Sequence, residues 1–444
     1  MSDVAIRGRR ILTMHGMRPA CVHVRNGVIT ALAAHDDVPR DLPILDVDEG
    51  DVVMPGLVDT HVHVNEPGRT DWEGFESATR AAAAGGITTL LDMPLNSIPA
   101  TTTRSALDAK RDAARGKAMV NVGFIGGVVP GNAHDLAPLH GAGVRIFKCF
   151  LVPSGVEEFP AVSEADLRVA LPILATLDAP LLVHAELPDR MVPVPVGDPR
   201  EYATYLASRP AAAETAAVDL MIALSKEFGA RVHIVHVSSA ESVPLLREAR
   251  QRGARISAET CPHYLTFAAE EIAAGATELK CAPPIRDRAN REALWRALLD
   301  GDLEMVVSDH SPCPPEMKAR STGDFFQAWG GIASLQVGLA ATWHEAKARG
   351  ATLEQLSTWM SLAPARLAGV GHRKGLLAPG YDADLVIWNP DTPVAVEART
   401  LYHRHPLTPY DGRTLTGAVR ATYVGGVEVY RDGEFLDTPI GRFI

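Results

Sequence analysis

Apolar runs alternate with helical segments through the middle of this 444-residue chain. Several connecting segments have helical periodicity, clearly at 72–84 and 163–177 and nearly so at 211–228 and 290–299. The eight apolar runs cover residues 52–64, 87–93, 118–129, 144–152, 180–187, 231–238, 255–265 and 303–309. Strands that alternate with helices predict a parallel sheet, and eight such repeats predict an α/β fold, the closed (β/α)8 TIM barrel. A doubly wound open sheet is the alternative, although no GxGxxG follows the first run.

The two chain ends show a different pattern, of short strand-like runs without a helical period. These runs lie at 4–6, 21–24, 28–32, 43–47, 383–388, 417–423 and 428–430. Turn pairs such as Asn26-Gly27 and Asp432-Gly433 separate some of them. The pattern predicts one small β-sandwich from residues 1–52 and 375–444, with the barrel over 53–374.

Polar side chains interrupt five of the apolar runs near their C-terminal ends. In a TIM barrel, active-site groups lie at the C-terminal ends of the strands. His61 and His63 are two residues apart on the first run, so they point the same way and can share a metal ion. Each histidine alone would more often be an ordinary hydrogen-bonded core residue than a ligand. Together these side chains predict one metal-binding active site: His61, His63, Lys148, His184, His236 and Asp309.

The sixth run offers two histidines, His233 and His236. Residues three apart on a strand face opposite sides, so only one of them is expected to face the barrel. His236 lies nearer the C-terminal end and is the predicted ligand. His233 is expected to pack toward the helices or to bind nothing.

Lys148 lies in the apolar run IFKCF, where a buried ammonium is unfavourable unless it is paired or neutralised. One alternative is an ion pair with Glu186 or Asp309. The other is a neutral amine that has added CO2, which gives a carbamate whose two oxygens bridge two metal ions. The residues alone leave both alternatives open.

Composition excludes some classes of function. The formal net charge of −11 argues against a nucleic-acid groove, which needs clustered Lys and Arg. No segment is long and apolar enough to span a membrane, and the N-terminus does not resemble a cleaved signal peptide. The five cysteines are widely spaced without a CxxC pair, which favours a reducing compartment. A cytoplasmic protein is therefore expected.

Several motifs resemble those of the binuclear-metal amidohydrolases, in the branch of dihydroorotases, hydantoinases and allantoinases. The matching stretches are PGLVDTHVH, HVHVNEPG, FKCF, VHAE, IVHVSS, SDHSP and GLLAPGYDADLVIW, and they span essentially the whole chain. The resemblance implies two divalent metal ions, with zinc as the first expectation and cobalt, manganese or iron as alternatives. It also implies a homo-oligomer, often a tetramer.

Carried over by motif, the resemblance also implies a role for each predicted ligand. His61, His63 and Asp309 would bind one ion, His184 and His236 the other, and a carbamate formed from CO2 on Lys148 would bridge both. Asp309 would also act as general base and then as general acid for a metal-activated water.

Sequence differences among the members of this branch indicate which substrate is expected. Dihydroorotases typically have HxHxR at the first strand, but here Asn65 stands at the position of that arginine. Their NPPLR corresponds to residues 282–286, which read APPIR. The stretches NEPGRTDWEGF, ETCPHYL, KCAPPIRD, FQAWGGIASLQ and HRHPLTPYDG look like allantoinases. The resemblance implies hydrolysis of the hydantoin ring of allantoin, a small cyclic ureide, to allantoate. Hydantoinase, dihydropyrimidinase or dihydroorotase activity is the alternative.

A non-catalytic structural protein of this fold is a further alternative, although all six ligand positions carry competent side chains. Four residues are predicted to contact the substrate. Asn65 and Asn96 offer amide groups suited to a urea-like ligand, although Asn is also a common turn residue. Ser311 and the backbone near Cys281 lie at the expected rim of the site.

Overall fold

The computed structural model describes residues 3–193 and 196–444 and confirms the predicted barrel. All strand pairings in its wall are parallel. The wall strands are β6 (Leu57–Val62), β7 (Ile87–Asp92), β8 (Asn121–Phe124), β9 (Gly126–Gly127), β10 (Phe147–Phe150), β11 (Leu181–His184), β12 (Val232–Ile234), β13 (Ile256–Thr260) and β14 (Met305–Val306). A parallel bridge between Val62 and His310 joins the segment after β14 to β6 and closes the wall.

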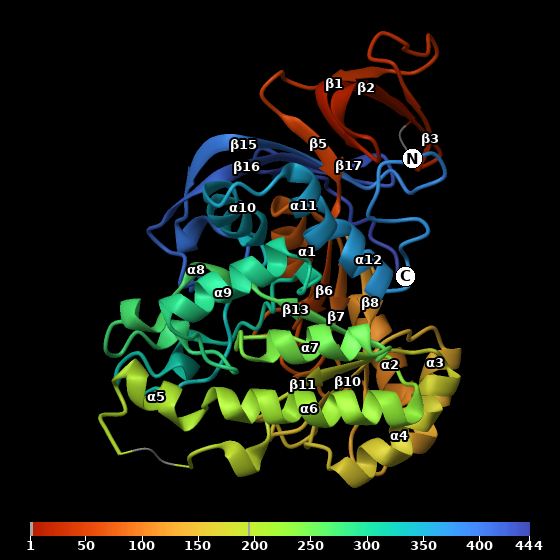
Figure 1. The fold of residues 1–444 in the computed structure, drawn as a ribbon. Coiled ribbons are helices and arrows are strands. Elements are labelled where there is room, and N and C mark those ends of the chain that lie inside the picture. Colours follow the sequence, from red (N-terminus) through yellow and green to blue (C-terminus); the bar gives the residue numbers. More distant parts are fainter. Residues whose placement is uncertain (1–2, 194–195) are drawn as a thin grey trace.

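Helices follow the strands and lie around the barrel (Figure 1). They are α1 (Phe75–Ala84), α2 (Arg104–Ala114), α3 (Ala133–Gly141), α4 (Glu164–Thr176), α5 (Tyr202–Ser208), α6 (Ala211–Phe228), α7 (Ser242–Gln251), α8 (Pro262–Thr266), α9 (Arg288–Leu299), α10 (Gly338–Ala348), α11 (Leu353–Ser357) and α12 (Ala363–Leu367). Local sequence sets several of their ends: Ser163 and Asp166 form a capping box at the start of α4, and Gly229 ends α6 in a left-handed conformation (φ 63°). None of the described helices combines the length and the apolar character needed to cross a membrane.

The two chain ends form one nine-stranded sheet, visible as neighbouring red and blue strands in Figure 1. Its strands are β1 (Val4–Thr13), β2 (Gly16–Arg25), β3 (Val28–Ala33), β4 (Ile44–Asp46), β5 (Val52–Pro55), β15 (Leu385–Ala395), β16 (Thr414–Val424), β17 (Val427–Arg431) and β18 (Glu434–Phe435). One apolar core joins side chains from both ends, among them Ile6, Val22 and Ile387. A bridge from Val28 to Asp382 brings β3 back to the C-terminal part.

The apolar run 52–64 is not the single strand that its sequence predicts. Val52–Pro55 is β5, which pairs with β1 and β15 in the terminal sheet, whereas Leu57–Val62 is β6 of the barrel. Gly56 lies between them, where an added Cβ would come within 2.3 Å of the Thr88 side chain. The chain therefore changes sheets inside a continuous apolar run. The domain limits 1–52, 53–374 and 375–444 stay a prediction.

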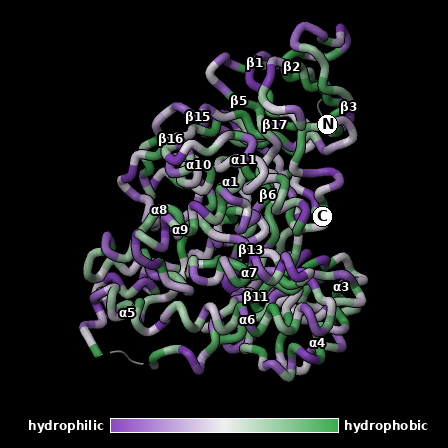
Figure 2. Tube along the Cα trace, in the orientation of Figure 1, coloured by the Kyte–Doolittle hydropathy of each residue, from purple (hydrophilic) through white to green (hydrophobic). Residues whose placement is uncertain are grey.

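Alternate residues of the barrel strands face two different cores. Phe147 and Leu181 belong to the large core shared with the helices, whereas Ile146, Phe150 and Leu182 belong to a smaller cluster. Apolar residues follow the inner strands and hydrophilic residues the outer loops in Figure 2. Because side chains alternate along a strand, Lys148 lies on the same face as Ile146 and Phe150. That apolar layer surrounds the polar site.

Candidate metal centre

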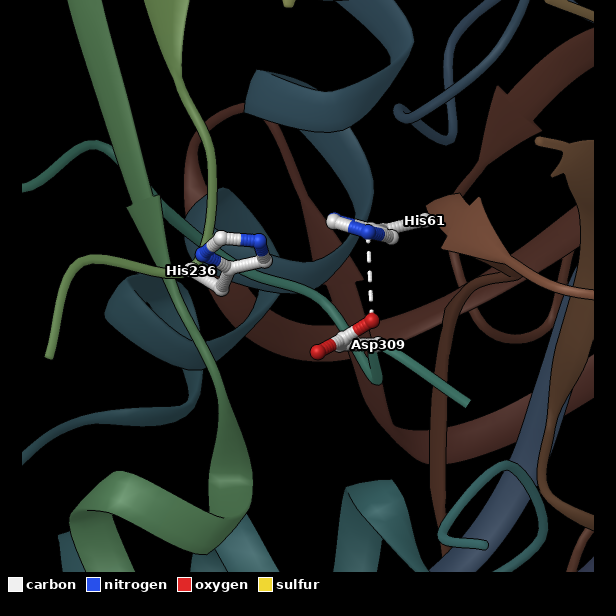
Figure 3. A group of neighbouring side chains, drawn as sticks. All are labelled: His61, His236 and Asp309. Atoms are coloured by element: carbon white, nitrogen blue, oxygen red, sulfur yellow. Dashed lines mark ion pairs between the residues drawn. The ribbon is translucent and has the colours of Figure 1, made fainter. Parts of the chain in front are cut away.

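The ends of several barrel strands bring the predicted ligands together in buried positions. His61 Nε2 lies 3.1 Å from Asp309 Oδ1, and His63 Nε2 lies 3.6 Å from the same oxygen. The His236 ring centroid lies 5.4 Å from that of His61 and 4.6 Å from that of His184. Figure 3 shows His61, His236 and Asp309 converging from three separate segments.

Two of these residues have an uncommon backbone conformation. His236 has φ 41° and Asp309 has φ 44°, in the left-handed region that is unfavourable for residues with a Cβ. Such conformations persist where the surrounding structure requires them, and they cluster at functional sites. The backbone at both positions thus supports a specialised role.

The prediction that only one of the two histidines near the sixth strand faces the barrel is wrong. β12 ends at Ile234, so the alternation of side chains does not continue to His236, and its positive φ turns the chain. His233 is also fully buried, and its Nε2 lies 3.0 Å from Glu259 Oε2. His233 therefore belongs to the polar network inside the barrel, and His236 lines the cavity.

Three histidines of this centre, His63, His184 and His236, are held in the uncharged form. Burial lowers the pKa of His63 to about 4, lowers that of His184 and places that of His236 well below its usual range. A neutral imidazole keeps the lone pair that binds a metal. Burial alone would raise the pKa of Asp309, but His61 and His63 hold it below its usual range. The site therefore offers neutral nitrogens and an ionised carboxylate.

Lys148 has no hydrogen-bond or ion-pair partner within residues 3–193 and 196–444. Glu186 instead pairs with Arg209 and with His184 Nε2, at 2.7 Å each, and Asp309 faces His61. The alternative of an ion pair between Lys148 and either acid is thus wrong. Burial lowers the pKa of the lysine to about 8, which increases the fraction of neutral amine.

These residues fit a divalent metal. Donor atoms of His61, His236 and Asp309 lie within 4.8 Å of one another, close enough to belong to one metal centre. His236 Nδ1 and Lys148 Nζ are buried without a hydrogen-bond partner among the described residues. Buried polar groups normally have partners, so both atoms favour a ligand at this position.

Sequence reasoning missed Glu259, which lies within the seventh apolar run, near the end of β13. Its Oε1 accepts a 2.5 Å hydrogen bond from His61 Nδ1, and its other oxygen contacts His233. His233 Nδ1 lies 2.7 Å from Ser257 Oγ. The hydrogen bond to Glu259 fixes the His61 tautomer, which leaves the Nε2 lone pair free for a metal ion. A lone Glu within an apolar run was the only signal in the sequence.

Glu259→Gln is expected to weaken divalent-metal binding about 10- to 100-fold, the usual effect of losing a carboxylate behind a histidine ligand. Glutamine offers only one acceptor oxygen, so the hydrogen bond that orients His61 weakens. A competition titration with a chelator measures the affinity. Glu304→Gln is the matched control, because Glu304 contacts Arg250 and the Ala258 amide rather than a predicted ligand. Unchanged affinity in Glu259→Gln would contradict this role.

The metal-free protein is expected to lose folding stability as the pH falls from 6.5 toward 4. Burial lowers the pKa of His63 and His263 from 6.5 to about 4, whereas the unfolded chain keeps the ordinary value. Between these values the unfolded state binds more protons, so acid favours unfolding. Urea unfolding of the metal-free protein measures this, and a constant free energy of unfolding across this range would oppose it.

A cavity of about 440 Å³ opens beside these residues. Three of the four predicted substrate contacts, Asn96, Cys281 and Ser311, are among the described residues that line it, whereas Asn65 is not. Asn65 is fully buried with φ 67°, which fits its alternative as a turn residue. Its Oδ1 is buried without a hydrogen-bond partner among the described residues, and contact of Asn65 with substrate stays a prediction. Asn96 also has a positive φ, of 66°, and its Nδ2 lies 3.4 Å from His63 Nδ1.

Comparison with known proteins agrees with this geometry. The model of the Amidohydrolase family matches residues 52–429. The chain is 50% identical to an allantoinase of Streptomyces avermitilis, over 100% of this chain and 99% of that protein. It is 44% identical to an allantoinase of Arabidopsis thaliana, over 98% of this chain and 90% of that protein. The L-hydantoinase (dihydropyrimidinase) structure from Arthrobacter aurescens has a TM-score of 0.94 at 32% identity, covering 100% of this chain and 99% of that chain. The chain therefore belongs to the amidohydrolase family.

Proposed function

We propose that this protein hydrolyses the hydantoin ring of allantoin to allantoate. The observation that carries the proposal is the 50% identity to a Streptomyces allantoinase over the full length of both chains. The 440 Å³ cavity beside the predicted ligands lies within the usual size range for small-molecule sites. A small cyclic ureide is the substrate class that fits both facts.

The predicted ligands would hold two divalent ions, with zinc as the first choice. His61, His63 and Asp309 would bind one ion, His184 and His236 the other, and a carbamate on Lys148 would join them. When bound, such ions polarise a carbonyl group and lower the pKa of water. The unpartnered Lys148 Nζ, with its lowered pKa, supports the carbamate, because the neutral amine is the form that reacts with CO2.

Asp309 is the group that would move the proton. Its carboxylate is ionised at neutral pH, because His61 and His63 hold its pKa low despite burial. It lines the cavity, so it can accept a proton from the attacking water. It would then return that proton to the ring nitrogen as the carbon–nitrogen bond breaks.

Part of the cavity wall carries unbalanced positive charge. Lys280 lines the cavity, and its Nζ donates to the Ala328 carbonyl and lies 5.3 Å from the centroid of the Tyr205 ring. No carboxylate lies within 4.0 Å of Nζ among the described residues. Burial, followed by the charges of Lys318 and Arg209, lowers its pKa to about 8, so it is still mainly charged at neutral pH. Its free N–H groups suit the carbonyl of the ureido group that allantoin carries on its ring.

Lys280→Met is expected to lower kcat/KM for allantoin at least about tenfold, the usual effect of losing a hydrogen bond to a charged group. Hydantoin lacks the ureido group, so its kcat/KM should change by less than about twofold. Steady-state kinetics on both substrates measures the difference. Lys226→Met, on the exposed side of α6, is the matched control. Equal losses on the two substrates would show that Lys280 does not recognise the ureido group.

Kinetics on four cyclic compounds test the proposed substrate. Allantoin, hydantoin, dihydrouracil and dihydroorotate are offered to the metal-replete protein, and ring opening is followed for each. The proposal expects the highest kcat/KM for allantoin. A faster reaction with hydantoin, dihydrouracil or dihydroorotate would favour the hydantoinase, dihydropyrimidinase or dihydroorotase alternative. The homotetramer and the cytoplasmic location stay predictions from the sequence.

A further inference from the structure

A second group of metal-binding side chains shares Asp309 with the predicted centre. Cys261, His263 and Asp309 offer a sulfur, a nitrogen and an oxygen that lie within 4.8 Å of one another, all buried. Cys261 follows β13 directly, and His263 lies in the first turn of α8. Neither Cys261 nor His263 is among the described residues that line the cavity, so the group lies deeper than the cavity surface.

The His263 ring lacks partners for both of its nitrogens. Nδ1 and Nε2 are buried without a hydrogen bond among the described residues, and the residue is 0% exposed. The hydroxyl of its neighbour Tyr264 donates its proton to the Pro283 carbonyl at 2.7 Å, so it has no proton to donate to this ring. An imidazole buried without partners is unfavourable, so this ring favours a ligand.

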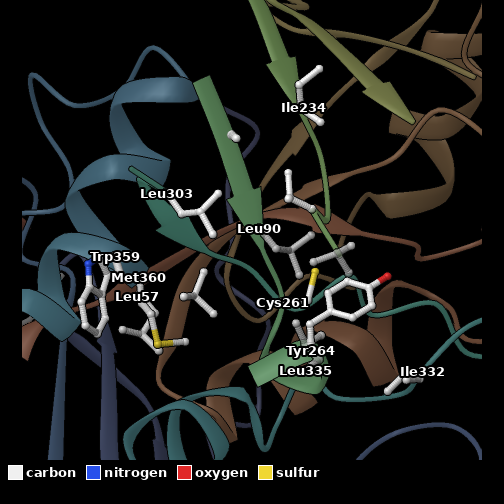
Figure 4. Packing of buried hydrophobic residues seen from close by; sticks show 14 of the residues in the cluster. Leu57, Leu90, Ile234, Cys261, Tyr264, Leu303, Ile332, Leu335, Trp359 and Met360 are labelled. Atoms are coloured by element: carbon white, nitrogen blue, oxygen red, sulfur yellow. The ribbon is translucent and has the colours of Figure 1, made fainter. Parts of the chain in front are cut away.

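Apolar side chains surround the thiol of this group. Cys261 and Tyr264 lie within the apolar cluster drawn in Figure 4. Burial, followed by the negative charges of Asp309 and Glu259, raises the pKa of the Cys261 thiol well above its usual range. An ordinary thiol is mainly protonated at neutral pH, so a metal that binds Cys261 must displace its proton.

We propose that Cys261, His263 and Asp309 form an additional site for a thiophilic divalent cation such as zinc or cadmium, and that filling it inhibits the enzyme. Sulfur, imidazole nitrogen and carboxylate oxygen are all zinc ligands, and the sulfur favours soft metals. On binding, the sulfur–hydrogen bond of Cys261 breaks, a sulfur–metal bond forms and the proton passes to water. The inhibition rests on the proposed function of Asp309, because a carboxylate oxygen bound to the added ion cannot accept a proton.

Cadmium titration of the metal-replete enzyme tests the proposal. Thiolate-to-cadmium charge-transfer absorption in the ultraviolet reports sulfur binding, and ring opening is measured on the same samples. We expect the absorption and the inhibition to rise together, with one added ion per chain. In Cys261→Ser the absorption should be absent, and half-inhibition should need at least about tenfold more cadmium, because a hydroxyl is a poor ligand for a soft metal. Cys21→Ser, a buried thiol in the terminal sheet, is the matched control and should titrate as the wild type.

Three outcomes would overturn the proposal: inhibition without thiolate absorption, equal inhibition of Cys261→Ser and wild type, or thiolate absorption from the resident ions before any excess is added. If Cys261→Ser does not fold, His263→Asn replaces it and should also weaken the absorption at a given cadmium concentration. The absorption needs no substrate. It therefore tests the site even if the protein does not open allantoin.

Discussion

Lys148→Ala is expected to lower kcat/KM for ring opening by at least about a thousandfold, because the group that would join the two ions is lost. The wild-type lysine lies fully buried beside the histidines, and its Nζ has no partner among the described residues. Alanine removes the only amine that could carry the carbamate at this position. Metal content should fall together with activity, and elemental analysis of the purified variant measures it.

Lys148→Arg separates the carbamate from a simple positive charge. Arginine keeps the charge but does not add CO2, so the carbamate account expects it to be as inactive as alanine. Substantial activity in Lys148→Arg would show that a cation is sufficient at this position. Addition of a short carboxylic acid to Lys148→Ala should restore part of the activity, because a carboxylate can replace the two carbamate oxygens.

Asp309→Asn is expected to lower kcat about 100- to 10,000-fold, the usual range for losing a general acid–base group. Asparagine has nearly the same shape, but its amide cannot accept and return the proton. The side chain can still offer one oxygen to a metal, so metal content should fall less than activity does. Steady-state kinetics and metal analysis of one preparation measure both quantities.

Asp382→Asn is the control for this variant. Asp382 pairs with Arg373 in the terminal part of the chain, away from the predicted ligands, so its loss should leave kcat unchanged. If Asp309→Asn kept wild-type kcat with bound metal, another group would have to move the proton. If it lost all metal, Asp309 would act mainly as a ligand.

The barrel could be predicted because each of its strands is recognisable from its own residues. A strand buried between a barrel interior and the surrounding helices must be apolar on both faces, and each of the eight runs marks such a strand. The helix at 211–228 was predicted with the limits that α6 shows. A polar residue near the end of such a run is unfavourable unless it has a function. This is why His61, Lys148, His184 and Asp309 could be recognised from their positions.

Other features depend on contacts that no local pattern encodes. The change of sheet at Gly56 falls inside an unbroken apolar run, because both sheets bury that segment. The orientation of His236 depends on where β12 ends and on a positive φ. Glu259 became recognisable only when the fold brought it to His61, 198 residues away in the sequence.

Reconstitution of the metal-free protein with zinc, with and without bicarbonate, tests the central claim most directly. Zinc per chain and conversion of allantoin to allantoate are measured on each sample. The account predicts close to two ions per chain and rapid allantoin opening with bicarbonate, and much lower values of both in CO2-free buffer. Full zinc loading and full turnover without CO2 would contradict the role of Lys148. Full loading without any opening of allantoin would contradict the proposed function.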